Sequence, residues 1–275
     1  MVKYLYEQLK SSRLFIFTTA VFLLLILWWL SIFFRGLTSG IENDAFTIVL
    51  PIFTLIGGIV GWKYSKKWGG FHSQLGRSIG MFTMGLLVQF LGYMLYTYYI
   101  YILGVEVPYP SIGDLFFFGS VLLYIYGAYL LAKVAGLVFS FSNIKNKILG
   151  ILIPLGILLA SYALFLNGYE PHWENFLVTF LDFGYPIGQA VYVSIALLAL
   201  LFSRDILGGM MRRPIILLLF ALIVQYIADF SFSYQVSRET WYVGGTNDLL
   251  YMVAGYLMTL AILSIGNMFY KVQES

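Results

Sequence analysis

The stretch Leu14–Phe34, LFIFTTAVFLLLILWWLSIFF, contains no charged residue. An α-helix rises 1.5 Å per residue, so about 20 apolar residues cross the hydrocarbon layer of a bilayer. This run is longer than the apolar core of a signal peptide, and no small-residue cleavage site of the A-x-A type follows it. We therefore expect a first transmembrane helix here, and no cleaved leader.

Seven similar apolar runs follow. Of the 275 residues, 60% are hydrophobic and 11% are charged, against roughly 25% charged residues in soluble domains. Such a composition cannot cover a water-facing surface, so we expect a single transmembrane domain over residues 1–275. The apolar runs predict an all-α integral membrane bundle of eight helices, near residues 14–34, 45–63, 79–103, 113–137, 147–167, 186–203, 214–236 and 248–268.

Basic residues occupy alternate gaps between these runs. Of the 16 Lys and Arg residues, only Arg35 and Arg238 fall in the odd-numbered gaps. The positive-inside rule therefore predicts a multi-pass protein of the cell membrane with both termini in the cytoplasm. The predicted cytoplasmic basic residues are Lys3, Lys10, Arg13, Lys63, Lys66, Lys67, Arg77, Lys133, Lys145, Lys147, Arg204, Arg212, Arg213 and Lys271.

Acidic residues show the opposite bias. Ten of the 13 map to the outer loops or the outer ends of helices, and only Glu7, Asp205 and Glu274 lie on the predicted cytoplasmic side. This distribution predicts a negative potential at the outer face.

Weak self-similarity links every second helix. Asn43-Asp44 opens the second helix and Asn247-Asp248 the eighth, while Pro110–Asp114 and Tyr185–Gln189 open the fourth and sixth in a shared pattern. We interpret the chain as four helical hairpins, an arrangement that often creates a central site between units.

The outer aspartates have two readings. Asp44, Asp114 and Asp248 stand where helices begin, and a carboxylate there accepts free backbone N–H groups and suits the helix dipole. A ligand role can add to capping. Asp229 differs, because it falls inside the seventh helix with Gln225 one turn earlier on the same face. An ionisable group inside a membrane-spanning helix should face the interior of the bundle or an aqueous cavity.

The segment 171–184 is amphipathic. Trp173, Phe176, Leu177, Phe180 and Leu181 share one helical face. Gly184 and Pro186 follow, so we expect a helix lying in the membrane interface rather than an extension of the sixth span.

Several chemistries are excluded by composition. The chain has no cysteine and only two histidines, which removes disulfides, iron–sulfur clusters and CxxC metal sites. We expect no metal, no cofactor and no nucleic-acid partner. No lysine falls mid-helix, which excludes a retinal Schiff base.

Five short segments carry a family resemblance. Pro108–Phe116 (PYPSIGDLF) resembles the P-S-x-x-D-x-[FY] helix start of multi-helix membrane sensor regions that precede bacterial and archaeal diguanylate cyclase and histidine kinase domains. Gly184–Gln189 (GYPIGQ) resembles their AYPLGD segment. Ala228-Asp229, Tyr242–Gly245 and Asp248–Tyr251 resemble their AD…Y…G…D..W ending.

The resemblance covers about residues 85–265 and implies a membrane-embedded sensory or ligand-binding region. Gln189 stands where those proteins carry an acid, which puts a shared cation site in question. They also continue into a cytoplasmic output domain, whereas this sequence ends at Ser275, so we expect any signalling to use a separate cytoplasmic partner.

We expect a non-enzymatic sensor or receptor module that binds a small ligand or ion near the outer face. The alternatives are a transporter or channel for a cation or small solute, an intramembrane lipid-processing enzyme with paired carboxylates, and a structural subunit of a membrane complex. The expected ligand-binding residues are Asp229, Gln225, Asp114, Asp248, Gln189, Gln89 and Asp182.

Overall fold

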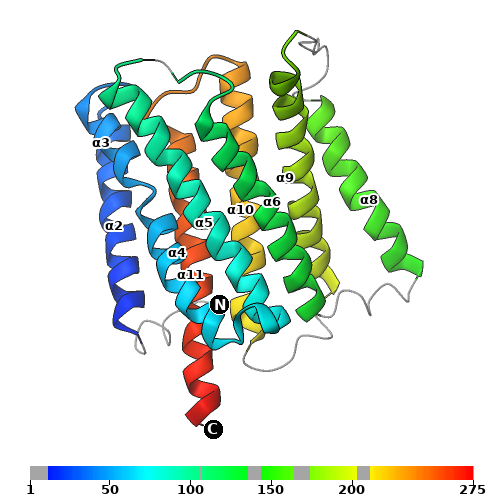
Figure 1. The fold of residues 1–275 in the computed structure, drawn as a ribbon. Coiled ribbons are helices and arrows are strands. Elements are labelled where there is room, and N and C mark those ends of the chain that lie inside the picture. The colour runs from blue at the N-terminus through cyan, green and yellow to red at the C-terminus, as the bar shows by residue number, and fades with distance from the viewer. Residues whose placement is uncertain (1–11, 106, 136–143, 164–173, 203–210, 275) are drawn as a thin grey trace.

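The computed structural model describes residues 12–105, 107–135, 144–163, 174–202 and 211–274, and the regular structure in these ranges is entirely helical (Figure 1). Eight helical segments in these ranges are long and apolar enough to cross a membrane, which confirms the predicted all-α, eight-helix class. The elements are α2 (Arg13–Phe34), α3 (Ile41–Val49), α4 (Ile52–Lys67), α5 (Gln74–Thr97), α6 (Ile112–Val134), α8 (Ile144–Ser161), α9 (Phe176–Phe202), α10 (Arg212–Ser237) and α11 (Thr246–Glu274).

The second span is two helices. α3 ends at Val49 and α4 begins at Ile52, with Pro51 between them. Proline lacks the N–H that would bond to the carbonyl four residues earlier, and its ring collides with that carbonyl. The break therefore follows from the sequence, and near the end of α3 the Thr47 hydroxyl bonds to Asp248 of α11.

α11 lies at the centre of the bundle and α8 at its edge (Figure 1). In the most apolar 18-residue window of each helix, 72% of the residues are buried in α11 and 6% in α8. α11 packs against α10, α4 and α2, whereas α8 packs against α9. The sequence-adjacent pairs α5–α6, α8–α9 and α10–α11 are in contact, and so are α4–α5 and α6–α9. These contacts alone do not single out four hairpins.

Small residues let α4 approach its neighbours closely. A Cβ added to Gly57 would lie 2.4 Å from Thr259 Oγ1 of α11, and one on Gly61 would lie 2.4 Å from Thr83 Oγ1 of α5. The Thr259 hydroxyl also donates a 2.7 Å hydrogen bond to the Phe53 carbonyl. The glycine spacing of α4 therefore serves packing inside the bundle.

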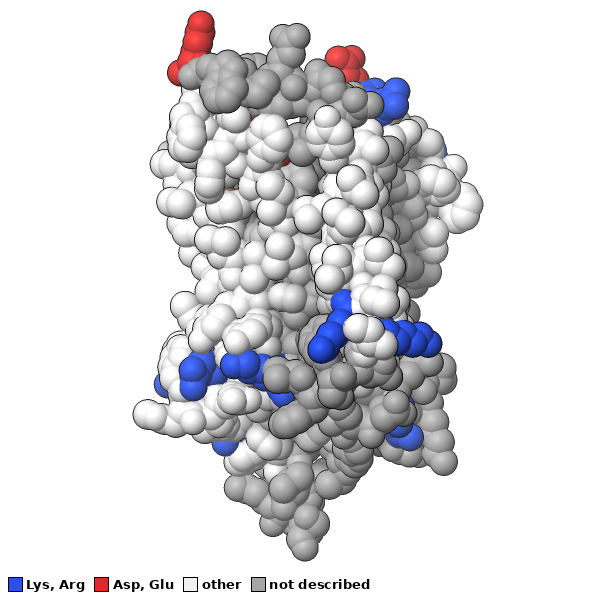
Figure 2. Space-filling view, turned by 90° about the vertical axis from the view of Figure 1, so that its right-hand side faces the viewer, with Lys and Arg blue, Asp and Glu red and all other residues white. Residues whose placement is uncertain are grey.

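The two ends of the bundle differ in charge (Figure 2). Lys63, Lys66 and Lys67 mark the end where α4 stops and α5 starts, which we call the basic end. Asp114 and Asp248 mark the end where α6 and α11 start, which we call the acidic end. α2 begins and α11 ends at the basic end (Figure 1).

The structure differs from the interfacial helix expected over 171–184. Residues 171–173 lie outside the described residues, and 176–184 form the first turns of α9, which continues through Pro186 to Phe202. Phe118 of α6 contacts both Phe180 and Tyr185, at ring-centroid distances of 5.3 and 5.5 Å. Packing on α6 from both sides of Gly184 keeps the helix continuous.

Candidate functional site

Asp229 lies in α10 with 9% of its surface exposed and accepts hydrogen bonds from uncharged side chains. The Tyr192 hydroxyl of α9 donates to Oδ2 at 2.7 Å, and Gln225 Nε2, one turn earlier on α10, donates to Oδ1 at 3.0 Å. The Tyr251 side chain of α11 also faces this carboxylate. The predicted Gln225–Asp229 pair is thus formed, and two other helices join it.

The polar contacts continue from Asp229 across the bundle. The Tyr192 ring meets Tyr124 of α6 edge to face, with centroids 6.3 Å apart. The Tyr124 hydroxyl donates a 2.7 Å hydrogen bond to Gln89 Oε1 of α5. Two of the predicted residues, Asp229 and Gln89, are therefore connected through two tyrosines that are almost completely buried.

Tyr93 and Tyr251 complete the same cluster. Their rings meet at 6.3 Å, and Tyr93 of α5 lies close to Gln89, Asp229 and Asp248. We call the set the Asp229 cluster, and it draws on α5, α6, α9, α10 and α11. Its members are Gln89, Tyr93, Tyr124, Tyr192, Gln225, Asp229 and Tyr251.

The cluster is rich in oxygen atoms and aromatic faces. Every interaction described for the Asp229 carboxylate comes from a hydroxyl or an amide. A carboxylate in an apolar interior is costly unless a positive charge or several donors compensate it. Chemically, the arrangement can hold a proton, a small cation, or a ligand carrying an ammonium group over the tyrosine rings.

Asp114 caps α6, as the first reading of the outer aspartates predicted. Its Oδ2 accepts from the Ser111 backbone N–H at 2.8 Å, and the Ser111 hydroxyl accepts from the Asp114 N–H, a reciprocal capping box. Oδ1 also faces the hydroxyls of Tyr96, at 3.5 Å, and Tyr185, at 3.4 Å. Its donors are not shared with Asp229.

Asp248 stabilises the start of α11 and joins it to α3. Its Oδ2 accepts from the Gly244 backbone N–H and from the Thr47 hydroxyl, both at 2.7 Å. The Trp29 indole N–H of α2 donates to the Gly244 and Gly245 carbonyls at 3.1 and 3.2 Å. The loop before α11 is therefore held by three helices.

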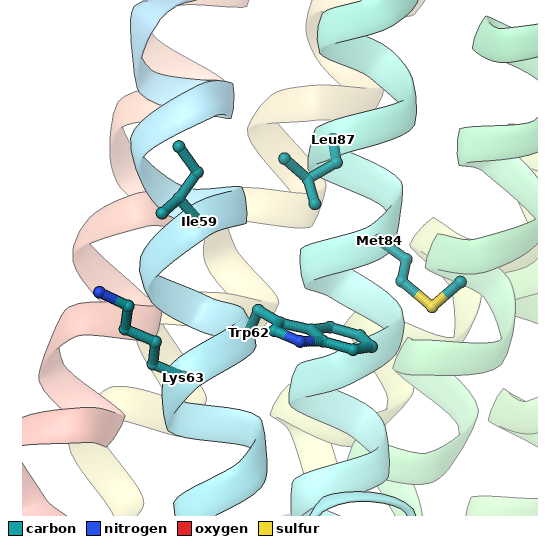
Figure 3. Close-up of a pocket in the computed structure, with 5 residues that line it drawn as sticks. All are labelled: Ile59, Trp62, Lys63, Met84 and Leu87. Carbon is teal, nitrogen blue, oxygen red and sulfur yellow. The ribbon is translucent and has the colours of Figure 1, made fainter.

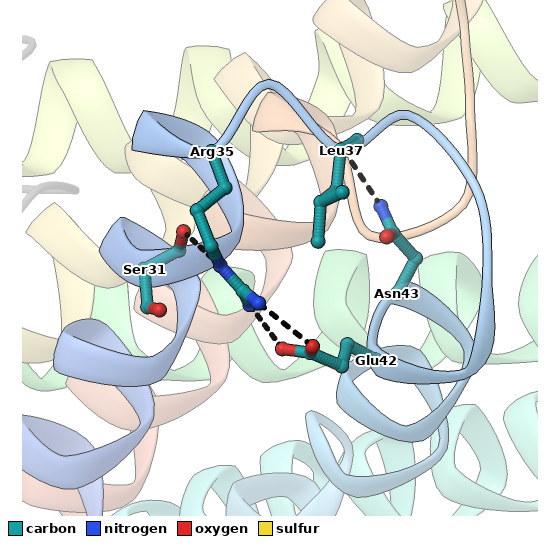
Figure 4. Close-up of polar contacts among 5 residues, drawn as sticks. All are labelled: Ser31, Arg35, Leu37, Glu42 and Asn43. Carbon is teal, nitrogen blue, oxygen red and sulfur yellow. Dashed lines mark hydrogen bonds and ion pairs between the residues drawn. The ribbon is translucent and has the colours of Figure 1, made fainter.

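The turn between α2 and α3 supports this loop (Figure 4). Arg35 and Glu42 form a bidentate ion pair, and Arg35 Nε donates to the Ser31 carbonyl at 3.0 Å. The hydrogen bond between Arg35 and the Glu42 carboxylate raises the pKa of the Arg35 guanidinium. Asn43 Nδ2 donates to the Leu37 carbonyl at 3.2 Å and to the Val243 carbonyl at 3.0 Å.

Two buried amides beside Asp248 have unused hydrogen-bonding capacity. Asn43 and Asn247 are both fully buried. Within the described part of the chain, Asn43 Oδ1 and both polar atoms of the Asn247 side chain have no partner. Buried polar groups are normally paired, so these atoms mark the acidic end of α11 as a place suited to a polar ligand.

The remaining predicted residues lie apart from the Asp229 cluster. Gln189 of α9 is buried, and its spacing puts it on the helix face between Tyr185, which contacts Asp114, and Tyr192, which contacts Asp229. Asp182 accepts a 2.6 Å hydrogen bond from Tyr109 at the surface of the bundle. The seven predicted residues thus separate into one connected cluster, two helix starts, one intervening residue and one surface residue.

Sequence reasoning missed Tyr124, Tyr192 and Thr47. Gln189 comes four residues after Tyr185 and three residues before Tyr192, so the spacing alone predicts a polar stripe on α9. Tyr124 and Thr47 carried no such signal, because a single tyrosine or threonine in an apolar run is common.

Among the described residues, no group of three or more His, Cys, Asp or Glu side chains could hold a metal ion. Comparison with protein-family models, with curated proteins and with solved structures found no match to this chain.

Proposed function

We propose that the chain is a membrane-embedded sensor or receptor module that binds a small cation near the outer face of the cell membrane. In this proposal the chain is built of four helical hairpins, the basic end faces the cytoplasm, both termini are cytoplasmic, and a separate cytoplasmic protein or membrane subunit receives the signal. The resemblance to membrane sensor regions points the same way.

The observation that carries the proposal is the Asp229 cluster. One carboxylate sits among tyrosines and glutamines from five helices, and all of its described partners are uncharged. A cation that neutralises Asp229 would compensate the cost of burying a negative charge. The same group contacts helices on several sides, so its occupancy would change how those helices pack.

The ligand class follows from the available atoms. One carboxylate with amide and phenol oxygens matches an alkali ion, and tyrosine faces match a small organic ammonium ion. Transition metals prefer several His, Cys or carboxylate ligands, and no such group occurs among the described residues.

A thermal-shift experiment tests the proposal. The purified protein in lipid nanodiscs is heated with NaCl, KCl, methylammonium chloride or choline chloride at constant ionic strength. At least one cation should raise the Tm of the wild type, and Asp229→Asn should abolish that shift. Asp182→Asn removes the same charge from a half-buried position outside the Asp229 cluster and should keep it. Equal responses of the two variants to all four cations would contradict the assignment.

A cation transporter is the second candidate, favoured because Gln89 and Gln225 both belong to the cluster. Flux of the stabilising cation into proteoliposomes distinguishes transport from sensing, since a sensor binds the ion without carrying it across.

A further inference from the structure

A groove opens on the outside of the bundle between α4 and α5, toward the basic end (Figure 3). It has a volume of about 500 Å³ and is lined by Ile59, Trp62 and Lys63 of α4 and by Met84 and Leu87 of α5. The Trp62 ring lies across the space between the two helices, with Ile59 and Leu87 on its acidic-end side (Figure 3). Four of the five lining side chains are apolar or aromatic.

The inner wall of the groove is a tight helix contact. Leu87 packs against Gly58, where an added Cβ would lie 2.4 Å from Leu87 Cδ2. At this level the Leu87 side chain of α5 therefore lies directly against the backbone of α4, and the apolar surface left outside the contact is a furrow. An acyl chain fits such a furrow better than a polar ligand does.

Basic residues surround the basic end of the groove, and among the described residues they form no ion pair. No Asp or Glu occurs between residues 45 and 105. Lys63 is exposed at the groove, and Lys66 Nζ lies 5.8 Å from the centre of the Trp62 ring. Arg77 precedes Met84 by two turns on the same face of α5, about 10 Å nearer the basic end. Arg77 Nε is buried and has no acceptor among the described residues.

We propose that this groove binds one anionic glycerophospholipid. An acyl chain lies along Ile59, Met84 and Leu87, and the phosphate lies beside Lys63, Lys66 and Arg77. Charge complementarity selects the lipid class: the site offers positive charges and an unused N–H donor, and a phosphate diester supplies negative charge and acceptor oxygens. A zwitterionic lipid brings its own cation and gains less.

The positive-inside rule alone requires basic residues at this end, without requiring a groove beside them. The two explanations differ in specificity. A purely topological role treats every lysine at the basic end alike, whereas a lipid site depends on those next to the groove.

Native mass spectrometry of the detergent-purified protein tests the site with phosphatidylglycerol and phosphatidylcholine of identical acyl chains. The wild type should retain phosphatidylglycerol several-fold more than phosphatidylcholine. Lys63→Gln/Lys66→Gln and Arg77→Gln should each reduce that ratio toward one. Lys147→Gln, the same charge change as Arg77→Gln but at the exposed start of α8, should leave it unchanged. Equal retention of both lipids by the wild type, or an equal loss in Lys147→Gln, would overturn the proposal.

Fluorescence quenching locates the lipid without relying on the charge variants. Phosphatidylglycerol brominated on its acyl chains should quench the protein's tryptophan emission more than brominated phosphatidylcholine does. Trp62→Phe should remove most of this difference, because Trp62 borders the groove. Trp28→Phe, on α2, should preserve it. A lipid difference that survives Trp62→Phe unchanged would place the bound lipid elsewhere and overturn the assignment.

Discussion

The Tyr192 hydroxyl donates a 2.7 Å hydrogen bond to Asp229 Oδ2 and so joins α9 to α10 inside the bundle. Tyr192 is completely buried, and its ring also meets Tyr124 of α6. One phenol therefore connects the buried carboxylate with two other helices.

Replacing Tyr192 by Phe removes the hydroxyl and keeps the ring. Interhelical hydrogen bonds in membrane proteins contribute about 0.6 kcal/mol on average and up to about 1.7 kcal/mol. We expect a loss near the upper value, about 1–2 kcal/mol, because the acceptor is a carboxylate. Thermal unfolding in detergent micelles measures it. Tyr162→Phe, at an exposed position, is the control, and a similar loss there would show that the hydroxyl bond is not the cause.

A double-mutant cycle separates the bond from other effects. Asp229→Leu alone leaves the Tyr192 hydroxyl and the Gln225 amide without their acceptor, at a cost of about 1–3 kcal/mol. Adding Tyr192→Phe should then cost little more, giving a coupling energy of at least about 0.5 kcal/mol between the two residues. Strictly additive losses would mean that Tyr192 and Asp229 act independently.

Thr47→Val tests the link between α3 and α11. The Thr47 hydroxyl donates to Asp248 Oδ2, and valine has the same shape without the donor. We expect a loss of about 1 kcal/mol and faster hydrogen exchange at the Gly244 amide, which bonds to the same oxygen. Thr246→Val, at an exposed position in the first turn of α11, should change neither quantity.

Gly85→Ala tests the packing of α5 on α6. An added Cβ would lie 2.4 Å from Tyr124 Cε1, and Tyr124 is fixed by its hydrogen bond to Gln89. Overpacking of this kind costs about 1–3 kcal/mol. Gly156→Ala, on α8, meets no atom within 4 Å, so it should be neutral or stabilising by up to about 1 kcal/mol. Unfolding midpoints that rank the two variants in the opposite order would refute this packing argument.

The absence of cysteine makes the proposed orientation directly measurable. A cysteine at Ser39, exposed at the acidic end, should react with a membrane-impermeant maleimide on intact cells. A cysteine at His72, exposed at the basic end, should react only after permeabilisation. Reversed labelling would place the acidic end in the cytoplasm.

Local features were predictable because each is decided within a few residues of chain. Hydropathy gave the spans, and the place of Asp114 at the start of a helix gave its capping role. Gln225 and Asp229 are four residues apart on one helix, so their hydrogen bond followed from helical geometry. In contrast, amphipathicity and Pro186 favoured a separate interfacial helix before the sixth span, and contacts with Phe118 of α6 outweighed both.

The sequence by itself determined eight apolar helices and the separation of basic from acidic residues along the chain, because lipid solubility and backbone hydrogen bonding are local properties. Only the tertiary structure decided that Tyr192 and Tyr124 carry the contacts from Asp229 to Gln89, and that α11 is central while α8 is peripheral. Those outcomes depend on how helix surfaces fit one another. In lipid, close packing rather than hydrophobicity chooses the neighbours of a helix, and packing is set by side chains far apart in the chain.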